Sequence, residues 1–153
     1  MSVEVAALPF PRLRHAVPTD ADRCAEIYLA SRRATFTWVE PERFQLADYA
    51  ESIKGEEVWV AELDGEVRAF ASFFLPESFL HNLFVMPGWQ RRGLGQALLG
   101  QVQRICPPPV RLKCLANNIS ARMFYQSMGW TEEGQGRSDL GFYVNMQAPV
   151  TTL

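Results

Sequence analysis

Two glycines and two arginines stand together at the start of a predicted helix. The segment reads Gln90-Arg91-Arg92-Gly93-Leu94-Gly95, and it follows a strand-like run, Phe79–Met86, that ends at Pro87-Gly88. The first N–H groups of a helix have no partner within it, and the helix dipole adds partial positive charge there. Glycines leave these amides uncovered, and the arginines add full charges. The segment indicates an anion site suited to a phosphate or pyrophosphate, although an ordinary turn with two solvated arginines would contain the same residues.

Two known phosphate-binding motifs do not fit this segment. A dinucleotide-binding fingerprint that starts at Gly93 requires glycine where Leu98 stands, and no acidic residue follows near 113–118 to bind a ribose. A Walker A loop that starts at Gly88 requires Lys and Ser or Thr where the chain has Leu94 and Gly95. The site is therefore expected to hold a phosphate without transferring it.

Composition narrows the class of protein. The chain has 153 residues, of which 48% are hydrophobic and 21% charged, as in an ordinary globular domain. The formal net charge of −2 gives no support for a nucleic-acid partner, and no apolar run is long enough to span a membrane. Cys24, Cys106 and Cys114 are an odd number without CxxC spacing, so they are interpreted as core residues in a reducing, cytoplasmic protein.

The elements that must position this segment follow from periodicity and turn residues. Asp64-Gly65 between two β-rich runs predicts a hairpin, Thr19-Asp20-Ala21-Asp22 resembles a capping box, and Pro41 suits the first turn of a helix. We expect strands at 13–17, 58–63, 67–75, 79–86, 110–116, 130–137 and 141–146. We expect helices at 19–33, 41–53, 94–105 and from Asn117 or Asn118 to Met128. This order predicts a single α/β domain over residues 1–153, with a mixed sheet covered by helices on both faces.

A second motif follows the fifth predicted strand. Asn118, Ala121, Phe124 and Tyr125 form Asn-x-x-Ala-x-x-Phe-Tyr, with Gly129-Trp130 four residues on. The pattern Q/R-x-x-G-x-G/A follows a strand and stands at residues 90–95. With both motifs, the chain resembles the GNAT superfamily of acyl-CoA-dependent N-acetyltransferases over nearly its whole length. The resemblance implies the GNAT fold, a mixed, mostly antiparallel central sheet of about seven strands with helices on both faces.

The resemblance also implies acetyl-CoA as cosubstrate, with no metal. The pyrophosphate of coenzyme A would lie on the turn formed by Gln90, Arg91, Arg92, Gly93, Leu94, Gly95 and Gln96. The pantetheine arm would lie along Leu83, Phe84 and Val85 like an added strand. Asn118 would reach the pantetheine amides, although it equally suits simple helix capping.

Acetyl transfer to an amine requires a base, because alkyl amines arrive largely protonated at neutral pH. His81 is the leading candidate, since imidazoles accept protons near neutral pH and some aralkylamine-acetylating members of the family have a histidine there. A solvated strand histidine is the alternative interpretation. Glu77, acting through a water, is the second candidate.

Tyr125 matches the general acid of the family, which protonates the departing thiolate. A tyrosine on an inward helix face also serves as a core residue. The backbone N–H of Val85, or of a near neighbour, is the expected donor to the thioester carbonyl.

Aromatic residues suggest where the acceptor binds. Phe36, Trp38 and Phe84 are expected near the acceptor site, and an aromatic wall favours a small-molecule amine, although this stretch can equally be core. Acetylation of a protein N-terminus or lysine is the alternative activity. A non-catalytic acyl-CoA sensor is the alternative of another class, and a homodimer is compatible with either.

Overall fold

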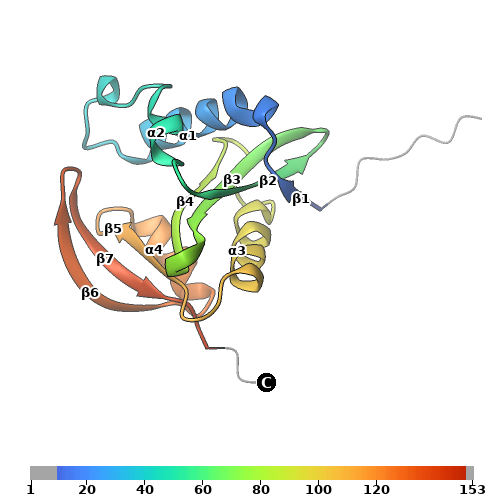
Figure 1. The fold of residues 1–153 in the computed structure, drawn as a ribbon. Helices are drawn as coiled ribbons and strands as arrows, with labels where there is room; N and C mark the ends of the chain where they lie inside the picture. Colours follow the sequence, from blue (N-terminus) through green and yellow to red (C-terminus); the bar gives the residue numbers. More distant parts are fainter. Residues whose placement is uncertain (1–9, 151–153) are drawn as a thin grey trace, which may run out of the picture.

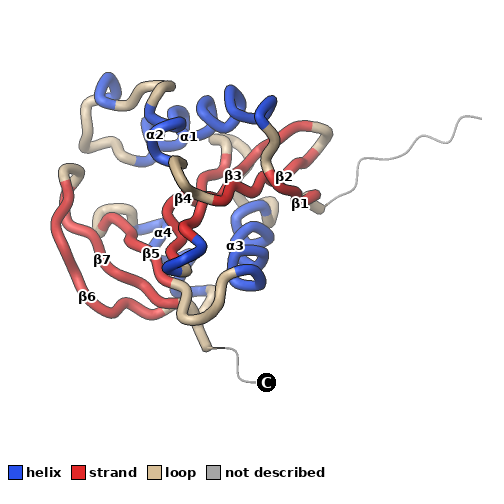
Figure 2. Tube along the Cα trace, in the orientation of Figure 1, coloured by secondary structure: helices blue, strands red, loops and turns tan. Residues whose placement is uncertain are grey.

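The computed structural model describes residues 10–150, so residues 1–9 and 151–153 of the expected single domain lie outside the described part. Strands and helices follow one another in the predicted order, with short 3₁₀ turns between some of them (Figure 1 and Figure 2). The strands are β1 (Arg12–His15), β2 (Glu57–Leu63), β3 (Glu66–Phe74), β4 (Phe79–Val85), β5 (Arg111–Leu115), β6 (Thr131–Ser138) and β7 (Gly141–Gln147). The helices are α1 (Ala21–Thr35), α2 (Asp48–Ser52), α3 (Leu94–Ile105) and α4 (Ile119–Ser127).

The strands of residues 10–150 form one seven-stranded sheet in the order β1-β2-β3-β4-β5-β7-β6. The pair β4–β5 is parallel, and the other neighbouring pairs are antiparallel. The expected mixed, mostly antiparallel sheet is therefore confirmed. The central parallel pair is short, with only Phe79↔Arg111 and Leu80↔Leu112 in register.

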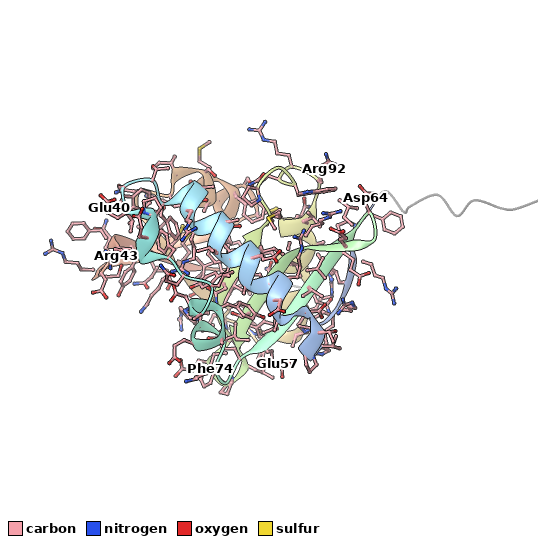
Figure 3. The ribbon with its side chains drawn as sticks, turned by 90° about the horizontal axis from the view of Figure 1, so that it is seen from above. Glu40, Arg43, Glu57, Asp64, Phe74 and Arg92 are labelled. Carbon is pink, nitrogen blue, oxygen red and sulfur yellow. The ribbon has the colours of Figure 1, made fainter. Side chains whose placement is uncertain are left out.

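Helices cover both faces of this sheet, as expected (Figure 1). On one face, Leu98 of α3 and Tyr125 of α4 join the largest apolar core, together with Phe73 of β3. On the other face, Ile27 of α1 and Tyr49 of α2 pack around Phe70. Figure 3 shows α1 crossing β2 and β3, between their Glu57–Phe74 end and the Asp64 turn.

The Asp64-Gly65 hairpin is also confirmed. Asp64 has φ 54° and Gly65 has φ 81°, and Leu63 pairs directly with Glu66. A two-residue turn with both φ angles positive matches the right-handed twist of the flanking strands, and Asp-Gly suits it because these residues tolerate that conformation.

The helix predicted over 41–53 is wrong in its first half. Pro41–Arg43 form only a 3₁₀ turn, and the chain is extended at Phe44, with φ −97° and ψ 127°. This extension buries the Phe44 ring beside Phe36, where the Arg32 guanidinium stacks on it 4.3 Å from the ring centroid. Tertiary packing of one aromatic side chain therefore overrides the local helical pattern, and α2 begins only at Asp48.

The three cysteines are free and buried, in agreement with their interpretation as core residues. Burial raises the pKa of the Cys24 and Cys114 thiols to about 11, and it raises the pKa of Cys106 as well. Thiols with such pKa values stay protonated at neutral pH and are poor nucleophiles. Within residues 10–150, no helix has both the length and the apolar character needed to cross a membrane.

Asp20 stabilises the start of α1 through hydrogen bonds from residues that precede it. The predicted capping box is therefore not what holds this end of the helix. Asp20 accepts hydrogen bonds from the Arg14 guanidinium at 2.7 and 3.0 Å and from the Val17 N–H at 2.8 Å. These contacts, the bonds from Arg14 foremost, hold the pKa of Asp20 below its ordinary value of 3.8. The carboxylate therefore stabilises the fold in its ionised form.

We expect Asp20→Asn to lower the free energy of unfolding by about 1–2 kcal/mol at neutral pH, because charge-assisted hydrogen bonds are lost. A lowered folded-state pKa gives stability that is fully present above the unfolded-state pKa and is lost as pH falls through the folded-state value. The deficit of the variant should therefore shrink below about pH 4. Urea unfolding at neutral and acid pH measures this difference in the free energy of unfolding. Asp139→Asn, in the exposed β6–β7 turn, is the control. An equal deficit at both pH values would contradict the assignment.

Candidate active site

The short β4–β5 pairing leaves backbone groups of β4 available for a ligand. The Met86 N–H bonds to the Arg68 carbonyl on the β3 side. N–H groups alternate in direction along a strand, so the Leu83 and Val85 amides face the β5 side. The register with β5 ends at Leu80, and both amides therefore lie where the two strands have diverged. The Val85 carbonyl at the same edge accepts a hydrogen bond from Ser31 Oγ at 2.8 Å.

The turn after β4 has the backbone conformation that an anion site requires. Gly88, Arg91 and Gly93 have φ angles of 90°, 65° and 80°, and Gly93 is the N-cap of α3. The first amide of α3 with a backbone partner is that of Ala97, which bonds to the Gly93 carbonyl at 3.0 Å. Within the described residues, the Leu94, Gly95 and Gln96 amides have no acceptor, and the first turn of α3 contains no acidic residue. These three amides and the helix dipole form an uncompensated positive end.

The polar side chains of this turn differ in what they contact. The Gln90 Oε1 accepts a hydrogen bond from the Gly88 N–H at 2.9 Å, so its side chain closes the turn. The Arg92 guanidinium lies 4.6 Å from the centroid of the Trp89 ring, and Arg91 is exposed. Neither arginine forms an ion pair with a carboxylate in residues 10–150. Figure 3 shows Arg92 on the loop before α3, at the end of the molecule that also holds Asp64.

Helix α4 brings the second motif against the first. A Cβ atom on Gly95 would lie 3.6 Å from Cζ of Phe124 and 3.9 Å from Cγ2 of Val85. The glycine-rich turn, the end of β4 and the Asn-x-x-Ala-x-x-Phe-Tyr helix therefore meet at one place. Asn118 caps α4, because its Oδ1 accepts the Ala121 N–H at 3.3 Å. Its contact with pantetheine stays a prediction.

Tyr125 is buried beside the same meeting point. Its ring lies 5.3 Å from that of Phe124 and 5.6 Å from that of Trp130, centroid to centroid. Burial, with a smaller contribution from Cys114, raises the pKa of Tyr125 above the ordinary value of 10.0. No group of residues 10–150 forms a hydrogen bond with its hydroxyl. Its role as general acid stays a prediction.

His81 occupies a β-bulge in β4. Ser72 pairs with Asn82 and Phe73 pairs with Leu80, so His81 is the extra residue without a partner on β3. A bulge re-aims a side chain at the edge of a sheet. The imidazole is 44% exposed, and its Nδ1 lies 2.9 Å from Oε2 of Glu56, whose side chain is only 10% exposed.

Glu56 is the candidate functional residue that sequence reasoning missed. An ionised carboxylate only accepts hydrogen bonds, so this contact places the hydrogen on His81 Nδ1 and leaves a lone pair on Nε2. The other carboxylate oxygen of Glu56 is buried without a partner among the described residues. Glu77, the second predicted base, is exposed in the 3₁₀ turn before β4. Twenty-five positions separate Glu56 from His81, and no local pattern links them.

A hollow of about 400 Å³ opens beside His81, between β4 and the strands that follow it. It is lined by Phe79, His81, Lys113, Leu115, Arg137, Ser138 and Tyr143. This volume lies in the range of small-molecule sites. Within the described residues, no cluster of three or more His, Cys, Asp or Glu side chains could hold a metal ion.

None of the three residues predicted at the acceptor site is among the lining residues of this hollow. Phe36 is 8% exposed, in an apolar cluster that packs on Leu115 of the hollow. The Trp38 Nε1 donates to the Leu140 carbonyl at 2.9 Å and so connects the loop after α1 to the β6–β7 turn. The Phe84 ring packs on Phe70 in the α1-side core. Their contact with an acceptor stays a prediction.

Known proteins with similar sequences are N-acetyltransferases. The model of the acetyltransferase (GNAT) family matches residues 21–130. The peptidyl-lysine N-acetyltransferase YiaC of Escherichia coli K12 is 37% identical over 84 residues, which are 50% of this chain and 56% of that protein. The [ribosomal protein bS18]-alanine N-acetyltransferase of the same strain is 35% identical over 75 residues, 45% of this chain and 51% of that protein. The chain thus spans about half the length of the curated relatives it matches.

Solved structures share the fold at low sequence identity. A GCN5-related N-acetyltransferase from Rhodopseudomonas palustris aligns with a TM-score of 0.79 and 19% identity, covering 97% of this chain and 100% of that one. The PaiA N-acetyltransferase of Thermoplasma acidophilum, solved in complex with coenzyme A, aligns with a TM-score of 0.70 and 17% identity, covering 88% and 97%. The family match, which covers more than half of the chain, agrees with the fold and with the meeting of the two motifs. The chain belongs to the GNAT family of acetyltransferases.

Proposed function

We propose that this protein is an N-acetyltransferase that moves the acetyl group of acetyl-CoA to the primary amine of a small molecule. The observation that carries the proposal is the arrangement along β4. His81 and a hollow lie at one end of the strand, free amides lie at Leu83 and Val85, and the positive end of α3 lies beyond the other end. In this proposal the acceptor, thioester and phosphate sites would follow one another along a single strand.

Coenzyme A fits this order. Its pyrophosphate would accept hydrogen bonds from the Leu94, Gly95 and Gln96 amides, with Arg91 and Arg92 adding positive charge. Its pantetheine amides would pair with the free edge of β4. The coenzyme A complex of the Thermoplasma acidophilum protein, which has the same fold, supports this choice of ligand.

The reaction would be direct attack of the amine on the thioester. His81 Nε2 takes a proton from the amine, the amine nitrogen bonds to the carbonyl carbon, and the backbone N–H of Val85, or of its near neighbour Leu83, stabilises the developing oxyanion. The carbon–sulfur bond then breaks, and Tyr125 protonates the coenzyme A thiolate. Glu56 holds the imidazole in the productive tautomer and stabilises its charged form.

Acetylation of a protein amine is the second candidate function, because the names of two relatives specify protein substrates. One relative is named for peptidyl-lysine and another for the alanine of a ribosomal protein. The hollow favours a small molecule, because its volume of about 400 Å³ suits one such ligand and its lining contains no carboxylate to bind a basic peptide.

The three free, buried cysteines support a reducing compartment such as the cytoplasm.

Thiol release from acetyl-CoA tests the proposal directly. We expect turnover with one or more members of a panel of arylalkylamines, amino acids and polyamines, and little turnover with lysine peptides or protein N-termini. Preference for the peptides would replace the small-molecule assignment with the protein one. Tight coenzyme A binding without turnover on any amine would instead indicate an acyl-CoA sensor.

A further inference from the structure

The hollow beside His81 has an unbalanced charge. Lys113 and Arg137 are among its lining residues, and the lining contains no aspartate or glutamate. Glu56, whose carboxylate bonds to Nδ1 of His81, is not among the lining residues. The lining therefore presents positive charge to whatever enters the hollow.

Neighbouring cations on the same half of the molecule have acidic partners. Arg111, two residues before Lys113, lies 3.5 Å from a carboxylate oxygen of Glu133, and Arg122 lies 2.9 Å from one of Glu132. Within residues 10–150, no carboxylate oxygen lies within 4.0 Å of the charged nitrogens of Lys113 or Arg137. The Lys113 Nζ lies 4.8 Å from the centroid of the Tyr143 ring, and the Arg137 guanidinium lies 5.1 Å from that of Phe142. Both cations can therefore bind an incoming anion without breaking an ion pair.

The register of the two central strands places Lys113 opposite the proposed base. The last parallel pair is Leu80↔Leu112, so His81 and Lys113 are the first residues on the two sides of the divergence. Side chains alternate along a strand, and the buried Leu80 and Leu112 both join the α3-side core. His81 and Lys113 consequently face the opposite side, where both line the hollow.

We propose that the acceptor amine also carries a carboxylate, and that Lys113 binds this carboxylate while the amine faces His81. Arg137 adds a second positive charge, and the rings of Phe79 and Tyr143 contact the apolar body between the two ends. This inference rests on the proposed function and narrows its substrate class to small aminocarboxylates. Polyamines and lysine-rich peptides are disfavoured, because their additional positive charges meet an unpaired ammonium.

Matched acceptors that differ only in the anionic group test the inference. Phenylalanine and phenylalaninamide, and 4-aminobutyrate and its amide, are compared by kcat/KM in the wild type and in Lys113→Met. The methionine keeps the apolar stem and removes the charge. We expect kcat/KM for the carboxylates to fall about 10-fold or more, and that for the amides to change less than about 2-fold, since a hydrogen bond to a charged group is lost only for the former. Comparing variant with wild type for each acceptor cancels the different basicities of the amines.

Charge reversal and a matched control make the test specific. Lys113→Glu should shift the preference further, toward the amides and toward cationic amines, and Arg137→Met should give a smaller loss for carboxylates. Lys54→Met, the same substitution at the exposed lysine beside Glu51, should leave the acceptor preference unchanged. Equal effects of Lys113→Met on acids and amides would overturn the carboxylate assignment, while turnover of the amides would still uphold the proposed function. Absence of turnover with every amine would overturn both.

Discussion

Replacing Tyr125 by phenylalanine is expected to lower kcat for acetyl transfer by about 10²-fold or more, because the coenzyme A thiolate then leaves without a proton donor. The fold should tolerate the change. The phenolic oxygen bonds to no other group among residues 10–150, and the ring keeps its contacts with Phe124 and Trp130. KM for acetyl-CoA should change little, since the hydroxyl acts after the thioester is bound.

The raised pKa of Tyr125 also has a consequence for the pH profile. A general acid must be protonated in order to act, and burial raises the pKa of this tyrosine above 10.0. The wild type should therefore show no loss of rate from Tyr125 ionisation below about pH 10. Tyr49→Phe is the control, because Tyr49 is also a buried tyrosine whose pKa burial raises, and it packs in the α1-side core, on the opposite face of the sheet from Tyr125. An unchanged rate for Tyr125→Phe across the pH range would show that the acid role is wrong.

Features of the fold encoded by neighbouring residues were predictable. Asp64-Gly65 specifies its turn locally, because both residues tolerate positive φ. Gly93 has φ 80°, which a glycine adopts without strain. Asn118 caps the helix it precedes through its own side-chain oxygen, which is also a local interaction. The family resemblance rests on two such local motifs, and Gly95 and Phe124 show that they meet in space.

Features that depend on distant contacts were not predictable. Phe44 leaves the predicted helix because a cluster formed with Phe36 buries it. Asp20 bonds to Arg14 and Val17 in place of the expected capping box, and the guanidinium that binds it is held on the other side by Glu62 of β2. The contact of Glu56 with His81 joins residues 25 positions apart at a β-bulge in β4, and the sequence of β4 alone gives no sign of that bulge.

Replacing His81 by glutamine is expected to lower kcat/KM by about 10²-fold or more and to remove the acid limb that an imidazole base gives to the pH–rate profile. Glutamine is chosen because its amide can still donate to Glu56, whose side chain is only 10% exposed and would otherwise lose its partner. Addition of imidazole should partly restore the rate of a His81→Ala variant if the ring acts as a base. A profile that keeps its acid limb in both variants would contradict the role of His81.

Glu56→Gln separates positioning from proton transfer at this site. The amide can donate to His81 Nδ1 and so favours the tautomer whose Nε2 carries a hydrogen, which cannot take a proton from the amine. We expect a loss of about 10-fold or more in kcat with the KM for acetyl-CoA unchanged, an acid limb that persists because the imidazole is still present, and partial recovery in Glu56→Asp. Glu57→Gln is the matched control, because the adjacent carboxylate is 43% exposed and lies 3.8 Å from His15.

Glu77→Gln examines the other predicted base. A rate that falls in this variant and is unchanged in the His81 variants would assign the base role to Glu77. A selective loss in the Glu56 and His81 variants would instead establish that an imidazole oriented by the Glu56 carboxylate acts on the amine.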